Sequence, residues 1–184
     1  QYTAQRLAWG LSGYRPKIVT ASGSGNDKVY AAVYVNDGVV TANAINYPEA
    51  AFEADAEYRR NHGWRLVSCA AYGTANAPLF APVYEQVDDV AWGWEAHDDG
   101  TQFNAHFNAY DDGECRPAFY AMSDFQRYLS IWHDDRVGSW SSVSGRTSLQ
   151  FAADKIAAAN AGLVPLCIAA GGAGANARFS AVFV

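Results

Sequence analysis

Two short acidic clusters are the segments of this sequence whose residue types could do chemistry. Residues 97–99 and 133–135 both read His-Asp-Asp. Their carboxylates could bind a calcium ion, or a histidine and a carboxylate could act together as an acid–base pair. A simpler interpretation is a helix-capping acidic loop for the first cluster and a turn for the second. We favour the simpler interpretation over both metal binding and catalysis.

Tryptophans lie close to both clusters in the sequence. An indole ring can stack on the apolar face of a sugar ring, while sugar hydroxyl groups bind carboxylate, amide or imidazole groups. The candidate ligand-binding residues are therefore Trp92, Trp94, His97, His133, Asp135 and Trp140. The alternative for each tryptophan is ordinary core packing, and it stays open.

Other chemistry finds little support in the sequence. Neither an HExxH pattern nor a Cys/His pair with zinc-ligand spacing occurs, and a Gly-x-Ser-x-Gly motif is absent. The glycine-rich run at 171–174 lacks the lysine and the following helix of a phosphate loop, so it predicts a hairpin turn. We expect no catalytic residue, no metal and no cofactor.

Composition limits the partners. The chain has 19 acidic and 13 basic residues, a net charge of -6, and its basic residues are scattered. A nucleic-acid surface needs clustered basic residues, so we expect no nucleic-acid partner. The sequence also contains no apolar run of about 20 residues, so we expect no membrane span. The oligomeric state is not predicted.

Three cysteines leave two interpretations open. Cys69 and Cys167 lie in strand-like runs, and Cys115 lies between the two. The favoured interpretation is buried free thiols that pack as small apolar groups. The alternative is one disulfide bond and one free thiol.

A repeat of about 50 residues organises the chain. Each unit reads as a helix, a glycine that ends it, a strand, a turn and a second strand. The glycines are Gly13, Gly63, Gly113 and Gly162. The second strands carry aromatic residues four positions apart: Tyr30 and Tyr34, Phe80 and Tyr84, Tyr128 and Trp132, Phe179 and Phe183. The predicted unit boundaries are about 1–45, 46–95, 96–144 and 145–184.

Local signals refine each unit. Asn46 followed by Glu49, and Thr147 followed by Gln150, predict helix starts. Short third strands are expected to follow the first three hairpins, at 39–41, 90–94 and 137–140. We expect the helix to cover one face of each hairpin and the alternating aromatic residues to fill the opposite face. A unit cannot bury both faces alone, so the four units are expected to fold as one α+β domain at 1–184.

The repeat resembles a known family. Its clearest copy contains Phe103, Phe107, Gly113, Arg116, Pro117, Tyr128, Trp132 and Asp135. This pattern is similar to the bacterial tandem repeat domain, which also forms the N-terminal domain of fungal polyglycine hydrolases. The resemblance implies a secreted domain of four tandem helix–β-hairpin repeats in an antiparallel barrel-like or half-barrel arrangement, with short helices packed on the strands.

The resemblance carries no chemistry of its own. In polyglycine hydrolases catalysis belongs to a separate domain similar to β-lactamases, and its Ser-x-x-Lys motif is absent here. We therefore expect a secreted, non-catalytic, lectin-like binding module for a carbohydrate, another small molecule or a surface. One alternative is a small hydrolase that uses His133 or His97 with a nearby aspartate. Another is a protein-interaction or protease-inhibitor module.

Overall fold

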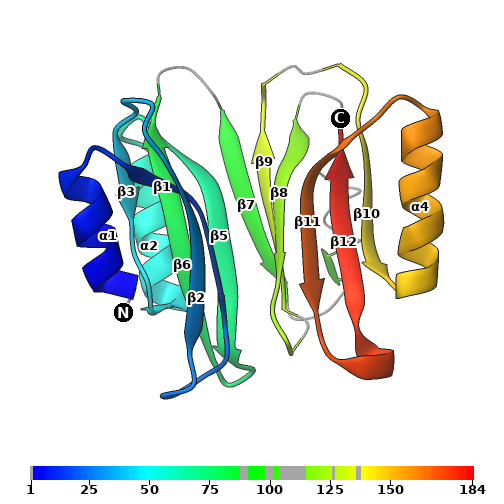
Figure 1. Ribbon diagram of the computed structural model, residues 1–184, viewed down its shortest axis with the longest axis horizontal. Coiled ribbons are helices and arrows are strands. Elements are labelled where there is room, and N and C mark those ends of the chain that lie inside the picture. Colours follow the sequence, from blue (N-terminus) through cyan, green and yellow to red (C-terminus); the bar gives the residue numbers. More distant parts are fainter. Residues whose placement is uncertain (1, 88–90, 98–101, 104–114, 126, 136–137) are drawn as a thin grey trace. The chain divides into compact units, whose positions relative to one another are not determined.

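The computed structural model describes residues 2–87, 91–97, 102–103, 115–125, 127–135 and 138–184. These residues form a mixed helix and sheet protein with three α-helices of defined bounds and four antiparallel sheets (Figure 1). The chain divides into two compact units, residues 1–89 and 90–184. The helix predicted before Gly113 falls outside the described residues except for Gln102 and Phe103, which are helical.

The first unit contains two helices and six strands. Its elements are α1 (Tyr2–Leu11), β1 (Arg15–Ser22), β2 (Val29–Val35), β3 (Thr41–Asn43), β4 (Tyr47–Pro48), α2 (Glu49–Arg60), β5 (Trp64–Thr74) and β6 (Ala77–Gln86). Strands β1 and β2 form a two-stranded sheet. In the other sheet β6 is central, with β5 on one edge and both β3 and β4 on the other.

The second unit contains two three-stranded sheets. Its elements are β7 (Trp92–His97), β8 (Arg116–Met122), β9 (Tyr128–His133), β10 (Ser141–Arg146), α4 (Ser148–Asn160), β11 (Pro165–Gly171), a 3-10 turn (Gly174–Asn176) and β12 (Arg178–Phe183). The strand orders are β7-β9-β8 and β10-β12-β11. The glycine-rich run lies in the turn between β11 and β12, as predicted.

The short third strands belong to different hairpins from those expected. Strands β3, β7 and β10 each pair with the second strand of the hairpin that follows them, at β6, β9 and β12. In terms of the sequence repeat, these strands therefore belong with the hairpin that follows them, whereas the sequence analysis placed each one at the end of the preceding repeat. Because the pairing partner lies about 40 residues away, the local pattern did not reveal it. None of the sheets formed by the described strands closes into a barrel.

All four hairpins carry a β-bulge at the same place. The register shifts between Pro16 and Ile18, Leu66 and Ser68, Pro117 and Phe119, and Pro165 and Cys167. A bulge adds one residue to one strand and bends it. Its recurrence after the first one to three residues of each first strand is independent evidence that the hairpins share one plan.

An aromatic ring pair joins a helical residue to a hairpin strand at four places in the described residues. The ring pairs and centroid distances are Tyr2–Tyr30 at 5.4 Å, Phe52–Phe80 at 4.7 Å, Phe103–Tyr128 at 5.4 Å and Phe151–Phe179 at 5.2 Å. The strand aromatics thus lie on the helix-covered face, and the prediction that they fill the opposite face was wrong. Ring pairs at this separation add to the free energy of apolar burial.

Within each of the two compact units, residues 1–89 and 90–184, a side chain of one hairpin accepts a hydrogen bond from the backbone of the other hairpin. The Val19 N–H of β1 donates to Ser68 Oγ of β5 at 3.4 Å, and the Tyr120 N–H of β8 donates to Cys167 Sγ of β11 at 3.3 Å. Ser68 and Cys167 both come directly after the bulge of their strand. Burial raises the pKa of the Cys167 thiol to about 11. All three cysteines are free thiols.

Helix ends follow the predicted signals in part. Thr147 and Gln150 form the predicted capping box at the start of α4. Gly13, Gly63 and Gly162 have φ values of 79°, 75° and 79°, the left-handed conformation that ends a helix. Asn46 does not cap α2, which begins at Glu49 without a side-chain cap. In the described part of the chain, none of the helices has the length and hydropathy to cross a bilayer.

Candidate functional site

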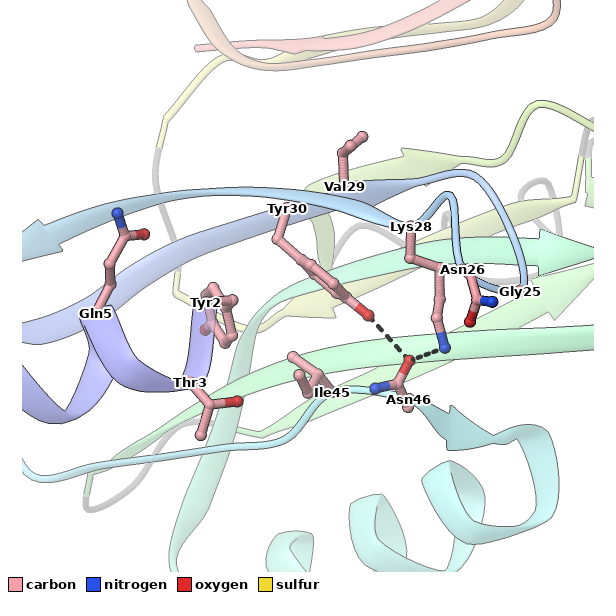
Figure 2. Close-up of a pocket in the computed structure, with 10 residues that line it drawn as sticks. All are labelled: Tyr2, Thr3, Gln5, Gly25, Asn26, Lys28, Val29, Tyr30, Ile45 and Asn46. Carbon is pink, nitrogen blue, oxygen red and sulfur yellow. Dashed lines mark hydrogen bonds between the residues drawn. The ribbon is translucent and has the colours of Figure 1, made fainter.

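A pocket of about 550 Å³ opens in the first unit between the start of α1, the start of β2 and the segment that leads into β4 (Figure 2). Its lining is mainly polar, with two tyrosine rings. The lining residues are Tyr2, Thr3, Gln5, Gly25, Asn26, Lys28, Val29, Tyr30, Ile45 and Asn46. An open pocket with amide, ammonium and aromatic groups can bind a polar ligand that also has apolar parts.

Asn46 organises the pocket wall. Its amide oxygen accepts hydrogen bonds from Lys28 Nζ at 2.8 Å and from the Tyr30 hydroxyl at 2.9 Å (Figure 2). The Tyr72 hydroxyl lies 3.3 Å from the same oxygen and accepts from the Asn46 backbone N–H at 2.7 Å. These contacts fix the orientation of the tyrosine and lysine side chains around one atom.

The position of Asn46 follows from a proline on the neighbouring strand. Pro82 lies in the middle of β6, and its carbonyl accepts from the Ala44 N–H at 3.2 Å. Because proline has no N–H, the pairing along this edge is interrupted between Asn43 and Tyr47. Within the interruption Asn46 takes a left-handed conformation, φ 60°, which asparagine tolerates better than most residues.

Lys28 gives the pocket a positive charge. The pocket lining contains no acidic residue, and the described residues place no carboxylate within ion-pair distance of Lys28 Nζ. Figure 2 shows Lys28 and Tyr30 directed to the same side of the strand, with Val29 directed away from it. The first turn of α1 adds the partial positive charge of a helix N-terminus. A chain of net charge -6 therefore presents a cationic pocket here.

The free edge of β2 runs away from this pocket. No strand among the described residues pairs with the edge of β2 that is opposite β1. The Val19 N–H donates to Ser68 and so points away from β2. Ala32 lies opposite Val19 in the pair, so its N–H and carbonyl also point away from β1, to the free edge of β2. Because backbone groups alternate along a strand, the N–H and carbonyl groups of Tyr30 and Tyr34 point to the same free edge.

Side chains on the outer face of the same strand are exposed apolar groups. Val29 is 62% exposed and Val33 is 52% exposed, while Tyr30 and Ala32 pack toward the core of the unit. An unpaired strand edge beside exposed aliphatic side chains is a ready template for pairing with another strand.

A buried ion network supports the opposite end of the hairpin. Arg15 donates to both carboxylate oxygens of Asp37, at 2.5 and 2.6 Å, and to Glu85 Oε1 at 2.6 Å. Lys17 Nζ lies 2.9 Å from the same Glu85 oxygen, and Arg65 Nη2 lies 3.6 Å from the other carboxylate oxygen, Oε2. The hydrogen bonds from Arg15 hold the pKa of Asp37 at about 2. The network ties β1, β5 and β6 together.

Three of the predicted site residues lie close together in the second unit. Trp92 of β7 pairs with His133 of β9, and the rings of Trp92 and Trp94 are 5.6 Å apart on one face. Trp92 is 8% exposed and His133 is 7% exposed, whereas Trp94 is half-buried. Trp94 is thus the member of this group with the most accessible ring.

Asp135 is held next to that group by an arginine. Arg116 pairs with His133 across β8 and β9, and it donates to both oxygens of Asp135, at 2.8 and 2.5 Å. The same fork joins Arg15 to Asp37 in the first unit. In both cases the aspartate comes three residues after the last aromatic of the strand, Tyr34 or Trp132, and the sequence interpretation did not recognise this as a signal of the pairing.

The remaining predicted residues lie elsewhere. His97 lies at the far end of β7 from Trp92, opposite Tyr128, and its side chain falls outside the described residues. Trp140 is half-buried just before β10, in the other sheet of the unit. The part of the chain that the structure describes contains no group of three or more histidine, cysteine, aspartate or glutamate residues able to hold a metal ion.

Sequence reasoning missed the pocket residues Lys28 and Asn46. The sequence pattern predicts a helix start at Asn46 and assigns no role to Lys28. The signal available was weak: Lys28 comes directly before the aromatic strand pattern, and the other second strands have no lysine there.

Comparison with known families agrees with this architecture. The model of the polyglycine hydrolase-like structural repeat matches residues 9–37, 44–87 and 137–184, more than half of the chain. The chain therefore belongs to the polyglycine hydrolase-like structural repeat family. No curated protein sequence matches it.

Proposed function

We propose that this chain is a non-catalytic binding module and that its first unit binds an extended strand along the free edge of β2. The observation that carries the proposal is the strand order of the four sheets. Three of them read third strand, second hairpin strand, first hairpin strand, at β3-β6-β5, β7-β9-β8 and β10-β12-β11. In the sheet of β1 and β2 the last two positions are filled, and no strand of the described residues occupies the first one.

We further propose that the chain consists of four helix–hairpin repeats of one plan. The common bulge, the four helix-to-strand ring pairs and the two side-chain bridges between hairpins support it.

Backbone geometry favours a strand as the occupant. An added strand would form main-chain hydrogen bonds with Tyr30, Ala32 and Tyr34, and those bonds supply affinity in strand addition. The registers in the filled sheets define the expected alignment: residues 92–97 of β7 lie opposite residues 133–128 of β9. The corresponding residues of β2 are 35–30.

The peptide Ala91–His97 is a suitable probe because its sequence already fills this position beside β9. We expect it to bind the full chain, and we expect Ala32→Pro to weaken binding roughly tenfold or more, because the substitution removes an edge N–H. Proline is tolerated at the matching position of β6, Pro82, so the hairpin should stay folded. Fluorescence anisotropy of the labelled peptide measures the affinity.

Ala31→Thr is the matched control, since Ala31 directs its backbone groups toward β1 and its side chain to solvent. It should leave peptide binding unchanged. The proposal fails if the chain does not bind the peptide, or if Ala32→Pro binds it as well as the unsubstituted chain does.

Carbohydrate binding is a second candidate, and Trp94 is the observation that favours it. Its ring is half-buried and lies on the same sheet face as Trp92 and His133, with the Asp135 carboxylate nearby. A half-buried indole beside polar groups can stack on a sugar. Secretion, implied by the family resemblance, remains a prediction.

A glycan array tests the second candidate. If the tryptophan face binds sugar, Trp94→Ala should remove about 1–2 kcal/mol of binding free energy, the stacking energy of one ring. Trp140→Ala, in the other sheet, should have no effect on a site at Trp94. Absence of any glycan signal, or a signal that survives Trp94→Ala, would exclude this site.

A further inference from the structure

The pocket lies where one particular residue of the added strand would sit. In the three filled sheets, the residue opposite the first aromatic of the second hairpin strand is Tyr47, His97 or Arg146. Tyr47 and Arg146 each come two residues before a helix, and Arg146 and His97 are the last residues of their strands. In the sheet of β1 and β2 the first aromatic of the second strand is Tyr30, which lines the pocket.

Strand geometry determines where the side chain of that residue points. Residues directly opposite one another in an antiparallel pair share a face of the sheet. Tyr30 and Lys28 are directed to the same face, toward Asn46 (Figure 2). A residue added opposite Tyr30 would therefore place its side chain in the pocket, next to Lys28 Nζ.

A pair in the second unit shows that this position can hold an ion pair. Arg146, opposite Phe179, donates from Nε to Asp154 of α4 at 3.0 Å. Asp154 comes three residues after Phe151, the helix partner of the ring pair, and the residue three after Tyr2 is Gln5. In the first repeat the helix carboxylate is thus replaced by the amide of Gln5, and Lys28 supplies the opposite charge.

We infer that the pocket selects an acidic side chain at the strand position opposite Tyr30. This inference rests on the proposed strand binding and states which side chain the bound strand should carry at that position. The Lys28 ammonium is already oriented by Asn46, so little further ordering is needed to meet a carboxylate. The helix N-terminus of α1 and the absence of lining carboxylates act in the same direction.

Three peptides test the selection. Each has the sequence of residues 91–97, is acetylated and amidated to remove terminal charges, and carries His97→Glu, His97→Gln or His97→Lys. The glutamate peptide should bind about five- to tenfold more tightly than the glutamine peptide, as expected for a partly buried ion pair. The lysine peptide should bind least tightly. The preference should shrink as salt is raised from 50 to about 500 mM, because screening weakens exposed ion pairs.

Substitution of Lys28 separates this inference from the proposed function. Lys28→Met should bind the three peptides with nearly equal affinity, and Lys28→Glu should prefer the lysine peptide. Lys155→Met, which changes the net charge equally but lies on α4, should keep the preference for glutamate. Equal binding of all three peptides to the unsubstituted chain would overturn the selection alone. Failure of every peptide to bind would overturn strand binding itself.

Discussion

Replacing Phe80 with alanine is expected to lower the free energy of unfolding of the first unit by about 3–5 kcal/mol, the usual cost of removing a fully buried phenylalanine ring. Phe80 is completely buried and stacks on Phe52 of α2 at a centroid distance of 4.7 Å. The substitution removes the apolar area of the ring, leaves a cavity and breaks the contact that joins helix to hairpin. Urea unfolding followed through the amide NMR signals of the first unit measures this loss.

Companion substitutions test whether the ring pair is a repeated element. Phe179 and Tyr30 occupy the same place in other repeats but are only partly buried, so Phe179→Ala and Tyr30→Ala should cost less than Phe80→Ala. Val33→Ala, at an exposed position of β2, should change the free energy of unfolding by no more than about 0.5 kcal/mol. A Phe80→Ala loss as small as that of Val33→Ala would contradict the assignment of this ring to the core.

Replacing Glu85 with glutamine is expected to destabilise the first unit by about 2 kcal/mol at neutral pH. Glu85 is 4% exposed and binds Arg15 and Lys17 through one carboxylate oxygen. Removing one partner of a buried ion pair leaves the other charges uncompensated, which usually costs about 3–5 kcal/mol. The smaller value is expected because Arg15 keeps Asp37 and because the glutamine oxygen can still accept a hydrogen bond.

The same substitution should change the response to acid. Burial alone would raise the pKa of Glu85, but the hydrogen bonds from Lys17 and Arg15 outweigh it and lower the pKa below its ordinary value. A carboxyl with a lowered folded pKa stabilises the protein fully above its unfolded pKa and loses this contribution as the pH falls through the folded value. The difference between the two proteins should therefore shrink below about pH 4.

Urea unfolding at several pH values measures this effect. Glu53→Gln, an exposed position on α2, is the matched control for the loss of one negative charge. It should be nearly neutral at every pH. A Glu85→Gln difference that stays constant from pH 7 to pH 3 would show that the carboxylate does not act through its ionised form.

The repeat and its hairpins could be predicted from the sequence because both are local patterns. The glycines at Gly13, Gly63 and Gly162 and the alternating aromatics identify helix ends and strands within a few residues. The partners of the third strands could not be predicted, because β3 and β6 are about 40 residues apart and many pairings satisfy the same alternation. Which face the helix covers also depends on this long-range packing.

The candidate site was predicted less well for a related reason. Tryptophan, histidine and aspartate were chosen for their chemistry, yet Trp92 and His133 are buried and Asp135 is paired with Arg116. The pocket depends on the edge of β2 that no described strand pairs with, and on the interruption of strand pairing that Pro82 causes near Asn46. Neither can be seen without knowing how the four hairpins correspond.

Amide hydrogen exchange of β2 tests the central claim most directly. In the free chain, the N–H groups of Tyr30, Ala32 and Tyr34 face the unpaired edge and should exchange rapidly. Saturation with the 91–97 peptide should slow their exchange roughly tenfold or more, while Ala31 and Val33, which face β1, should change little. Unchanged exchange at all three edge positions under saturating peptide would contradict strand addition at β2.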